Sequence, residues 1–340
     1  MVFKDILNSL MAGQDLDRDS MRTVMDHVMD GELTPAQIGA LLTALRIKGE
    51  TIDEISAAAA SMREHATRVD GGDGPLVDTC GTGGDGAHTI NISTGAAIVA
   101  AAAGCRIAKH GNRSVSSKCG SADVLMALGV NLDLTPEQVG ACVREVGIGF
   151  LFAPKLHGAM KHAIGPRREL GVRTIFNMLG PLTNPAGAEA QVLGVFAPEL
   201  TETFAHVLNS LGSRRALIVH GNDGLDEITT TSTTRVAEVR DGTVSTWELD
   251  PLPYIGSFAD SAALKGGEAE ENAAILRSLF AGEASKEVTD IVVLNAAAAI
   301  YVNALDDLSF ADAVDAARAA IANGGASAKL EALVAFSQSQ

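Results

Sequence analysis

The sequence predicts an α/β protein in which a small all-helical N-terminal domain precedes a larger α/β domain with a mostly parallel central sheet. Residues 1–70 show only helical periodicity, whereas strand-like and helix-like segments alternate from residue 76 onward, which is typical of parallel sheets. Between these patterns, residues 70–75 read Asp-Gly-Gly-Asp-Gly-Pro and indicate a boundary. We therefore expect domains at 1–70 and 71–340.

The composition agrees with this fold class. Of 340 residues, 46% are hydrophobic but only 4% are aromatic, which suits alanine-rich helices packed on a Val/Ile/Leu sheet. The net charge of −16 argues against binding to nucleic acid or to an anionic membrane, because the chain has no overall basic field. An anionic ligand must therefore be held by a local positive cluster.

Features of targeting and redox chemistry point to a soluble, cytoplasmic protein. The four cysteines show no metal-binding spacing and are expected to be reduced thiols. The first residues do not form a signal peptide. The longest apolar run, residues 96–105, is far shorter than the ~18 residues that a membrane helix needs.

Four amphipathic helices are predicted in residues 1–70. Apolar side chains recur at helical spacing in residues 3–11, and again in residues 21–29 after Ser20, a good N-cap. Capping boxes at 34–37 and 51–54 begin two further helices, the first with proline at its first position and the second running through Met62.

The α/β pattern from residue 76 onward has the following elements. Strands are expected at 76–77, 106–108, 148–152, 191–196, 216–220 and 291–294. Helices are expected at 94–103, 124–128, from 135, from 154 to about 169, and at 198–211. Residues 235–250 predict an antiparallel hairpin that turns at Asp241-Gly242.

A glycine-rich loop follows the first strand, and the rest of the chain is organised around it. Residues 80–86 read Cys-Gly-Thr-Gly-Gly-Asp-Gly, and a polar stretch leads to a helix whose expected N-cap is Ser93 or Thr94. A strand, a glycine loop and a helix N-terminus together predict an anion site, most often for phosphate. A plain tight turn is the alternative, but such a turn has no need of the polar residues of this loop.

The same loop formally matches the GxGxxG pattern of nicotinamide-dinucleotide folds. Those folds carry an acidic residue ~20 positions further on, at the end of the second strand. Here the second strand ends in Lys109-His110, and the region around 101 is alanine. A nicotinamide-dependent oxidoreductase is therefore the weaker hypothesis.

A basic run, residues 109–118, follows the second strand. Loops at the carboxyl ends of neighbouring parallel strands face one crevice, so Lys109, Arg113 and Lys118 are expected near the glycine loop. The alternative is a solvated basic loop.

Adjacent carboxylates follow the strand at 216–220. Asp226 and Glu227 lie in the run 223–227, and such a pair is usually solvated surface. The functional alternative is a magnesium site, because Mg²⁺ is usually held by one or two carboxylates together with substrate phosphates. The Ser93 hydroxyl could add a ligand.

Few other residues suggest chemistry. Arg167 and Arg168 could bind a carboxylate group of a ligand, or they could only interact favourably with the negative end of a helix dipole. The sequence leaves both interpretations open. His157 and His162 are five residues apart, so they do not share a helix face. No pattern of a covalent nucleophile is present.

Together these segments resemble the anthranilate phosphoribosyltransferase family. The resemblance is carried by Cys-Gly-Thr-Gly-Gly-Asp at 80–85, Asn-Ile-Ser-Thr at 91–94, Lys-His-Gly-Asn-Arg-Ser-Val-Ser-Ser at 109–117, Asn-Met-Leu-Gly-Pro-Leu-Thr-Asn-Pro at 177–185 and Asp-Glu at 226–227. It implies a homodimer of the nucleoside phosphorylase/phosphoribosyltransferase-like fold, in which a helical segment near 165–185 joins the small domain. It also implies transfer of the 5-phosphoribosyl group of phosphoribosyl diphosphate to the amine of anthranilate, with release of diphosphate, in tryptophan biosynthesis.

The resemblance also implies the site. Phosphoribosyl diphosphate would be bound by Gly81, Gly84, Asp85, Thr89, Asn91, Ile92, Ser93, Thr94, Lys109, His110, Gly111, Asn112, Arg113, Ser114, Val115, Ser116, Ser117 and Ser121. Anthranilate would contact Gly81, His110, Asn112, Arg167 and Pro181, with Arg167 on its carboxylate. Ser93, Asp226 and Glu227 would hold two Mg²⁺ ions per subunit.

The residues themselves agree with this mechanism. The amine of anthranilate is already a nucleophile, so no acid or base is required. Lys109, Arg113, Asp226 and Glu227 would act by positioning and electrostatics. The alternatives are a pyrimidine-nucleoside phosphorylase of the same fold, against which the acidic pair counts, and a catalytically silent relative that binds nucleic acid, against which the net charge counts.

Overall fold

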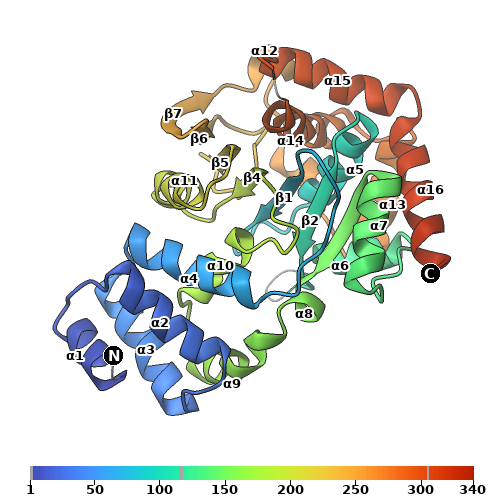
Figure 1. Ribbon diagram of the computed structural model, residues 1–340. Coiled ribbons are helices and arrows are strands. Elements are labelled where there is room, and N and C mark those ends of the chain that lie inside the picture. The colour runs from blue at the N-terminus through green and yellow to red at the C-terminus, as the bar shows by residue number, and fades with distance from the viewer. Residues whose placement is uncertain (1–2, 115–117, 305) are drawn as a thin grey trace.

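The computed structural model describes residues 3–114, 118–304 and 306–340 (Figure 1). Within these ranges, seven strands form one sheet in the order β3-β2-β1-β4-β5-β6-β7. Their bounds are β1 Val77–Gly81, β2 Ile107–Gly111, β3 Ile148–Phe152, β4 Ala190–Gly194, β5 Arg215–Gly221, β6 Thr234–Arg240 and β7 Thr243–Leu249. β1 to β5 pair in parallel, and only β6 and β7 pair antiparallel. The predicted mostly parallel sheet and the hairpin turn at Asp241-Gly242 are confirmed.

Helices cover the sheet and form the N-terminal bundle. The α-helices are α1 Phe3–Met11, α2 Arg18–Met29, α3 Pro35–Lys48, α4 Ile52–His65, α5 Ile92–Ala102, α6 Ser121–Ala127, α7 Pro136–Val146, α8 Ala153–Leu156, α9 Lys161–Leu170, α10 Phe176–Leu179, α11 Leu200–Ser210, α12 Leu252–Ile255, α13 Ala269–Phe280, α14 Lys286–Asn303, α15 Phe310–Ala322 and α16 Gly325–Gln338. Short 3₁₀ helices are η1 Gly158–Met160, η2 Gly180–Leu182 and η3 Ser261–Leu264. No helix among the described residues is both long and apolar enough to cross a bilayer.

The bundle contains α1 to α4, and α9 packs against α2 and α3 although it lies far away in the sequence. Both predicted capping boxes, at Thr34 and Thr51, are present. The predicted cap at Ser20 is wrong, because the Asp17 side chain caps α2 by accepting from the Ser20 N–H at 2.7 Å. An aspartate accepts this bond as well as a serine does, and Asp17 stands three residues earlier.

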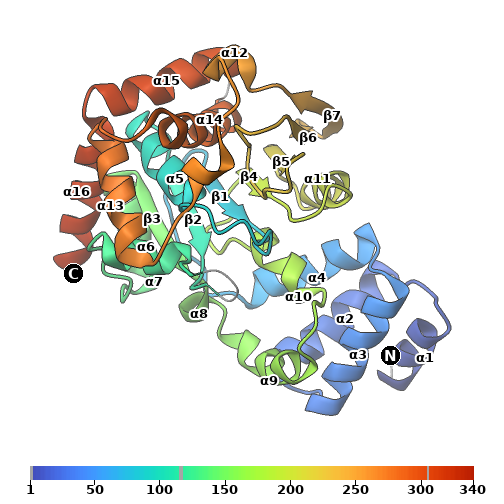
Figure 2. The same cartoon turned by 180° about the vertical axis from the view of Figure 1, so that it is seen from behind.

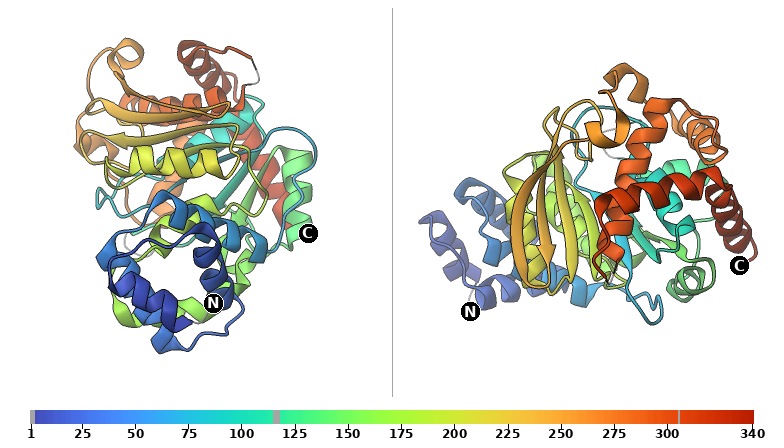
Figure 3. Two further views of the ribbon diagram at one scale, coloured as in Figure 1. Left: turned by 60° about the vertical axis from the view of Figure 1, so that its left-hand side comes forward. Right: turned by 90° about the horizontal axis from the view of Figure 1, so that it is seen from above.

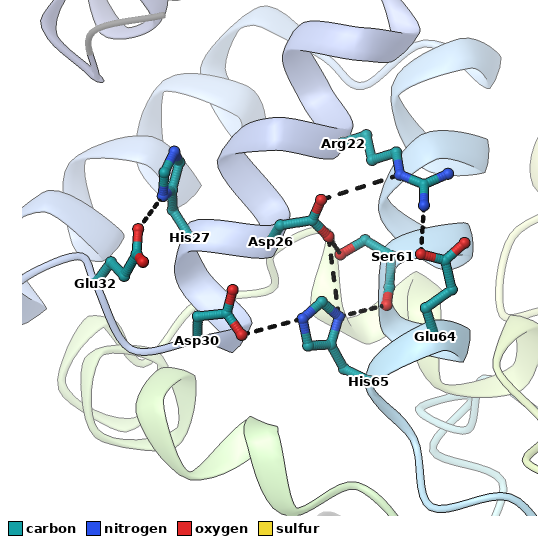
Figure 4. A network of polar contacts seen from close by, with 8 residues as sticks. All are labelled: Arg22, Asp26, His27, Asp30, Glu32, Ser61, Glu64 and His65. Carbon is teal, nitrogen blue, oxygen red and sulfur yellow. Dashed lines mark hydrogen bonds and ion pairs between the residues drawn. The ribbon is translucent and has the colours of Figure 1, made fainter.

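Polar contacts join α2 to α4 within the bundle (Figure 4). The Ser61 hydroxyl donates to Asp26 at 2.6 Å, and His65 bridges the Ser61 carbonyl and the Asp30 carboxylate. Since α4 also packs on α10 and α11, these contacts connect the bundle to the sheet side of the molecule.

The two faces of the sheet are buried against different helices. In β5, Leu217 and Val219 pack with α5 and α13 to α16, whereas Ala216 and Ile218 pack with α11 and the bundle. The bundle and the C-terminal helices consequently lie on opposite sides of the sheet (Figures 2 and 3). At one edge of the sheet, β7 has four exposed polar side chains, the half-buried Val244 and Trp247, and the buried Leu249.

Three further predictions differ from the structure. Residues 291–294 are not a strand but the middle of α14, which is buried along nearly its whole length between β4 and the helices α5 and α15. A continuous apolar run does not distinguish a buried helix from a buried strand. The predicted helix from 154 to about 169 is broken into α8, η1 and α9, because His157 leaves the helix to contact His110 and Gly158 follows it.

The third difference concerns α5, whose N-cap is Asn91 rather than Ser93 or Thr94. The Asn91 amide does not cap the helix. Its Nδ2 donates to the Cys119 carbonyl at 3.2 Å, and its Oδ1 accepts from Asn272 at 2.9 Å. The first turn of α5 therefore begins with no side-chain cap and points toward the glycine loop.

Candidate active site

Three loops meet at the carboxyl edge of the sheet. The glycine loop (residues 82–91) follows β1, the second loop (112–120) follows β2, and the acidic loop (222–231) follows β5. The Gly83 N–H donates to Asp226 Oδ2 at 2.8 Å, and Lys109 Nζ donates to Ser93 Oγ at 3.2 Å. These two bonds link the glycine loop to the acidic loop, and β2 to the first turn of α5.

The carboxylates of the acidic loop are crowded electrostatically. Burial, and then the nearby charge of Asp85, raise the pKa of Asp226 to about 7. Burial and the neighbouring Asp226 raise the pKa of Glu227, while Lys109 opposes this rise. These groups lie beside the start of α5, which carries the Ser93 hydroxyl. Oxygen donors with an excess of negative charge fit a hard divalent cation such as Mg²⁺.

The acidic pair does not form a complete metal cage. No group of three or more His, Cys, Asp or Glu side chains in the described part of the chain is arranged to hold a metal ion. Mg²⁺ is usually held by one or two carboxylates and completes its shell with water and substrate phosphates. The donor set therefore fits a cation that arrives together with a phosphate ligand.

Lys109 is the buried cation of the site, with 3% of its surface exposed. Its ammonium donates to the Thr79 carbonyl and hydroxyl as well as to Ser93. Burial lowers its pKa, whereas the charge of Asp78 opposes the shift. Asp78 is itself fully buried and accepts from the His110 N–H at 2.9 Å. Lys109 is thus held rigidly beneath the edge where the three loops meet.

The acidic loop is anchored at both ends. Asp223 Oδ2 accepts from the hydroxyls of Thr229 and Thr231. Beyond Glu227, the Ile228 N–H donates to Asn295 Oδ1 at 3.0 Å, and Asn295 Nδ2 donates back to the Ile228 carbonyl at 2.9 Å. Asn295 is a buried residue of α14, so this helix positions the carboxylates.

The glycine loop has backbone conformations that favour glycine. Gly83, Gly84 and Gly86 have positive φ angles, and His88 also has φ 53°. Thr89 forms an isolated antiparallel bridge with Lys265, which holds the end of the loop. Just beyond, the buried Thr94 hydroxyl has no hydrogen-bond partner among the described residues. A loop of this shape beside an uncapped helix start can receive a phosphate group.

The second loop is only partly brought to this site. The Ser121 hydroxyl donates to the Asn112 carbonyl at 3.2 Å, so these residues lie together. Arg113 is exposed, and its guanidinium contacts Met126 on α6 at 3.7 Å rather than the glycine loop. Lys118 is also exposed. Val115, Ser116 and Ser117 lie outside the described residues.

A histidine pair lies on the other side of Lys109. The Nε2 atoms of His110 and His157 are 3.1 Å apart, and both side chains are buried. Burial, together with their mutual repulsion, lowers the pKa of His110 to about 3, and burial lowers the pKa of His157 to about 4. Both rings are therefore neutral near pH 7, and one ring donates a hydrogen bond to the other. Pro181 follows Gly180, whose backbone accepts from His110.

Arg167 lies on α9, on the bundle side. Its guanidinium is 5.1 Å from the ring centroid of Phe176, and burial lowers its pKa. Contacts with the glycine loop come from a different arginine, Arg173, which the sequence did not single out. The contacts of His157 and Asn295 were missed as well, because each acts through a partner more than forty positions away.

The histidine pair gives the protein a specific acid sensitivity. Below pH 6.5 an unfolded histidine takes up a proton that the folded His157 refuses until about pH 4. Stability should therefore fall as the pH falls through this window, by up to about 1.4 kcal/mol per pH unit for this one group. In urea unfolding at pH 7, 6 and 5, the difference in free energy of unfolding between wild type and His157→Gln should shrink stepwise. A difference that stays constant over this range would contradict the buried neutral pair.

Comparisons with known proteins agree with this architecture. The family model described as "Glycosyl transferase family, helical bundle domain" matches residues 4–66, and "Glycosyl transferase family, a/b domain" matches residues 73–327. The chain is 54% identical to the anthranilate phosphoribosyltransferase of Acetivibrio thermocellus, covering 99% of this chain and 97% of the relative. It is 55% identical to that of Thioalkalivibrio sulfidiphilus over 96% of each.

Solved structures agree as well. The anthranilate phosphoribosyltransferase of Thermus thermophilus superposes with a TM-score of 0.92 at 46% identity, covering 98% of this chain and 99% of that one. The enzyme of Saccharomyces cerevisiae in complex with PRPP and Mg superposes with a TM-score of 0.89 at 26% identity, covering 99% and 98%.

Proposed function

The chain belongs to the anthranilate phosphoribosyltransferases, and from this premise we propose how its residues carry out the reaction. The enzyme transfers the 5-phosphoribosyl group of phosphoribosyl diphosphate to the amine of anthranilate in tryptophan biosynthesis. The products are N-(5-phosphoribosyl)anthranilate and diphosphate. The observation that carries the assignment is identity above 50% over nearly the whole chain, together with the loops that meet at one sheet edge.

Phosphoribosyl diphosphate binds along the glycine loop, the first turn of α5 and the second loop. The supporting features are the positive-φ glycines, the unpaired Thr94 hydroxyl and the nearby Lys109. Lys109 places a fixed positive charge beneath the diphosphate and lowers the cost of its departure. Gly111, Asn112, Arg113, Ser114 and Ser121 would contact the other side of the ligand.

Ser93, Asp226 and Glu227 hold Mg²⁺, for which we propose two ions per subunit. Yeast relatives have been solved with Mg. When bound, Mg²⁺ neutralises charge on the diphosphate leaving group. The protein's own part is to keep the carboxylates in place through Gly83 and Asn295.

Anthranilate occupies the side of the site formed by Gly81, His110, Asn112 and Pro181, with Arg167 on its carboxylate. Its amine attacks C1′ directly, so no residue has to remove a proton first. The neutral His110–His157 pair suits an aromatic acceptor, because an uncharged imidazole packs against a ring without the cost of burying a charge. Catalysis is then positioning plus electrostatic stabilisation.

Arg167→Ala should raise the KM for anthranilate while leaving the Kd of phosphoribosyl diphosphate unchanged. A charge-assisted bond to the carboxylate is worth about 1.5–3 kcal/mol, which corresponds to about a 10- to 100-fold rise in KM. Initial rates over an anthranilate series at saturating cosubstrate measure this effect. An unchanged KM would remove Arg167 from the acceptor site, and the exposed neighbour Arg168 supplies the charge-matched control.

We also propose a homodimer in the cytoplasm and a domain boundary at residues 70/71. Three bundle helices that contact one another in the order α1, α3, α9 each carry a large exposed apolar side chain: Met11, Ile47 and Ile164. Exposed apolar side chains of this kind favour self-association through the bundle. Cys80, Cys105 and Cys142 are free thiols, in keeping with a reducing compartment. Light scattering should give twice the chain mass of 35.1 kDa, and a monomer at micromolar concentration would refute the dimer.

The function is tested by the loss of anthranilate fluorescence on addition of phosphoribosyl diphosphate, with and without Mg²⁺. A Mg²⁺-dependent loss is the expected result. No loss in a folded sample that binds phosphoribosyl diphosphate would retain the phosphate site and discard anthranilate as the acceptor.

A further inference from the structure

Arg173 contacts the glycine loop from a segment that belongs to the bundle side of the molecule. Its Nη2 donates to the Gly84 carbonyl at 3.0 Å. Its guanidinium carbon lies 3.9 Å from the ring centroid of Phe196, a close cation–π contact. One flat side chain thus makes a hydrogen bond in its plane and a stacking contact with its face, which a guanidinium does better than an ammonium.

Phe196 is in turn tied to the glycine loop. Its N–H donates to Thr82 Oγ1 at 3.0 Å, and the Thr82 N–H donates to the Gly194 carbonyl at 2.8 Å. The residues Thr82, Gly84, Arg173 and Phe196, which we call the arginine clasp, therefore form one connected unit. It joins the end of β4, the start of the glycine loop and the segment between α9 and α10.

The space around Gly84 shows how closely Arg173 approaches the loop. A Cβ on this residue would lie 2.6 Å from Arg173 Nη2, and its φ of +84° already disfavours a side chain. The loop backbone and the guanidinium are therefore packed directly against each other.

The acceptor-site candidate Arg167 lies on α9, just before the segment that carries Arg173. Only five residues separate them, and α9 packs on α2 and α3 of the bundle. Through Arg173, the bundle-side segment is tethered to the loop that receives the diphosphate.

We propose that Arg173 is a positioning residue that holds the glycine loop in the form that binds phosphoribosyl diphosphate and couples this loop to the Arg167 segment, an inference that rests on the proposed function. Arg173 acts through the Gly84 carbonyl, so its removal loosens the loop before any ligand is present. Binding must then restore the order that the clasp supplies in the wild type, which weakens affinity.

The test uses Arg173→Gln, Arg173→Lys and Phe196→Leu in the full-length protein, with Arg168→Gln as the control that removes the same charge from an exposed position nearby. Arg173→Gln should raise the Kd of phosphoribosyl diphosphate about tenfold, the size expected for one lost charge-assisted bond. The KM for anthranilate should rise less. Arg173→Lys should recover only part of the affinity, and the effects of Arg173→Gln and Phe196→Leu should be less than additive, because both break the same clasp.

A second readout is independent of turnover. Backbone amides of residues 82–90 should exchange with deuterium faster in ligand-free Arg173→Gln than in wild type, and Arg168→Gln should leave them unchanged. Three results would each overturn the proposal. They are amide exchange in Arg173→Gln at the wild-type rate, a Kd of phosphoribosyl diphosphate within twofold of the wild-type value, and an effect confined to the KM for anthranilate. If the wild type failed to use anthranilate, the proposed function would be refuted. Amide exchange of the glycine loop and the Kd of phosphoribosyl diphosphate would still test the role of Arg173.

Discussion

Replacement of both Asp226 and Glu227 by alanine is expected to lower Mg²⁺-dependent turnover by about a thousandfold or more, since two of the three proposed metal ligands are lost. The thermal stability of the metal-free protein, by contrast, should not fall. Burial raises the pKa of both carboxyl groups, and so does a neighbouring carboxylate, Asp85 for Asp226 and Asp226 for Glu227, so their ionised forms oppose folding when no cation is bound. The metal-free double variant should therefore melt at the same temperature as wild type or higher. Fluorescence rates and thermal denaturation in EDTA measure the two effects.

The control for this variant removes the same charge elsewhere. Asp315 and Glu331 are exposed on α15 and α16, and Asp315→Ala/Glu331→Ala should keep wild-type turnover and Mg²⁺ dependence. Full activity in Asp226→Ala/Glu227→Ala would remove that pair from the metal site. Lost activity with a strongly lowered Tm would assign it a structural role instead.

Gly194→Ala is expected to be the most disruptive single methyl addition near the site. Gly194 ends β4, and a Cβ there would lie 1.6 Å from the Asp226 carbonyl oxygen and 2.6 Å from its carbonyl carbon. Both atoms are backbone, and Asn295 holds the acidic loop just beyond them, so no flexible side chain can give way. We expect a loss of about 3 kcal/mol or more in the free energy of unfolding. Turnover should fall about a hundredfold or more, because the carboxylates are displaced.

Gly39→Ala provides the matched comparison. Gly39 lies inside α3, and a Cβ there would meet nothing within 4 Å. Alanine should leave activity unchanged and raise stability by up to about 1 kcal/mol, because it is the better helix former. Urea unfolding and the fluorescence assay on both variants test the pair. Wild-type Mg²⁺ affinity in Gly194→Ala would show that the acidic loop does not depend on this close approach.

Local chemistry made much of the fold predictable. Thr34 and Thr51 begin helices with their own capping boxes, and Asp241-Gly242 turns a hairpin, because each pattern acts within a few residues. The larger errors came where tertiary packing decides. Residues 291–294 are apolar because α14 is buried on all sides, and helix 154–169 breaks because His157 finds a partner on β2.

The candidate site, like the fold, was predictable in part from the sequence. Parallel topology predicted that the loops after β1, β2 and β5 would meet, and the Gly83–Asp226 and Lys109–Ser93 bonds join them. Arg113 contacts Met126 instead, since position in a loop does not determine where a long side chain lies. Arg173 and Asn295 carry no local pattern. Each contacts residues that are distant in the sequence, and these partners come together only in the folded protein.

The β7 edge of the sheet affects the risk of aggregation while the chain is still folding. An unpaired edge strand is a template onto which a second chain can add its own strand, and parallel sheets form slowly enough to expose such edges. On β7 the exposed positions are Thr243, Ser245, Thr246 and Glu248, all of them polar. An edge this polar offers an incoming strand little apolar surface to bury, which protects the chain against aggregation.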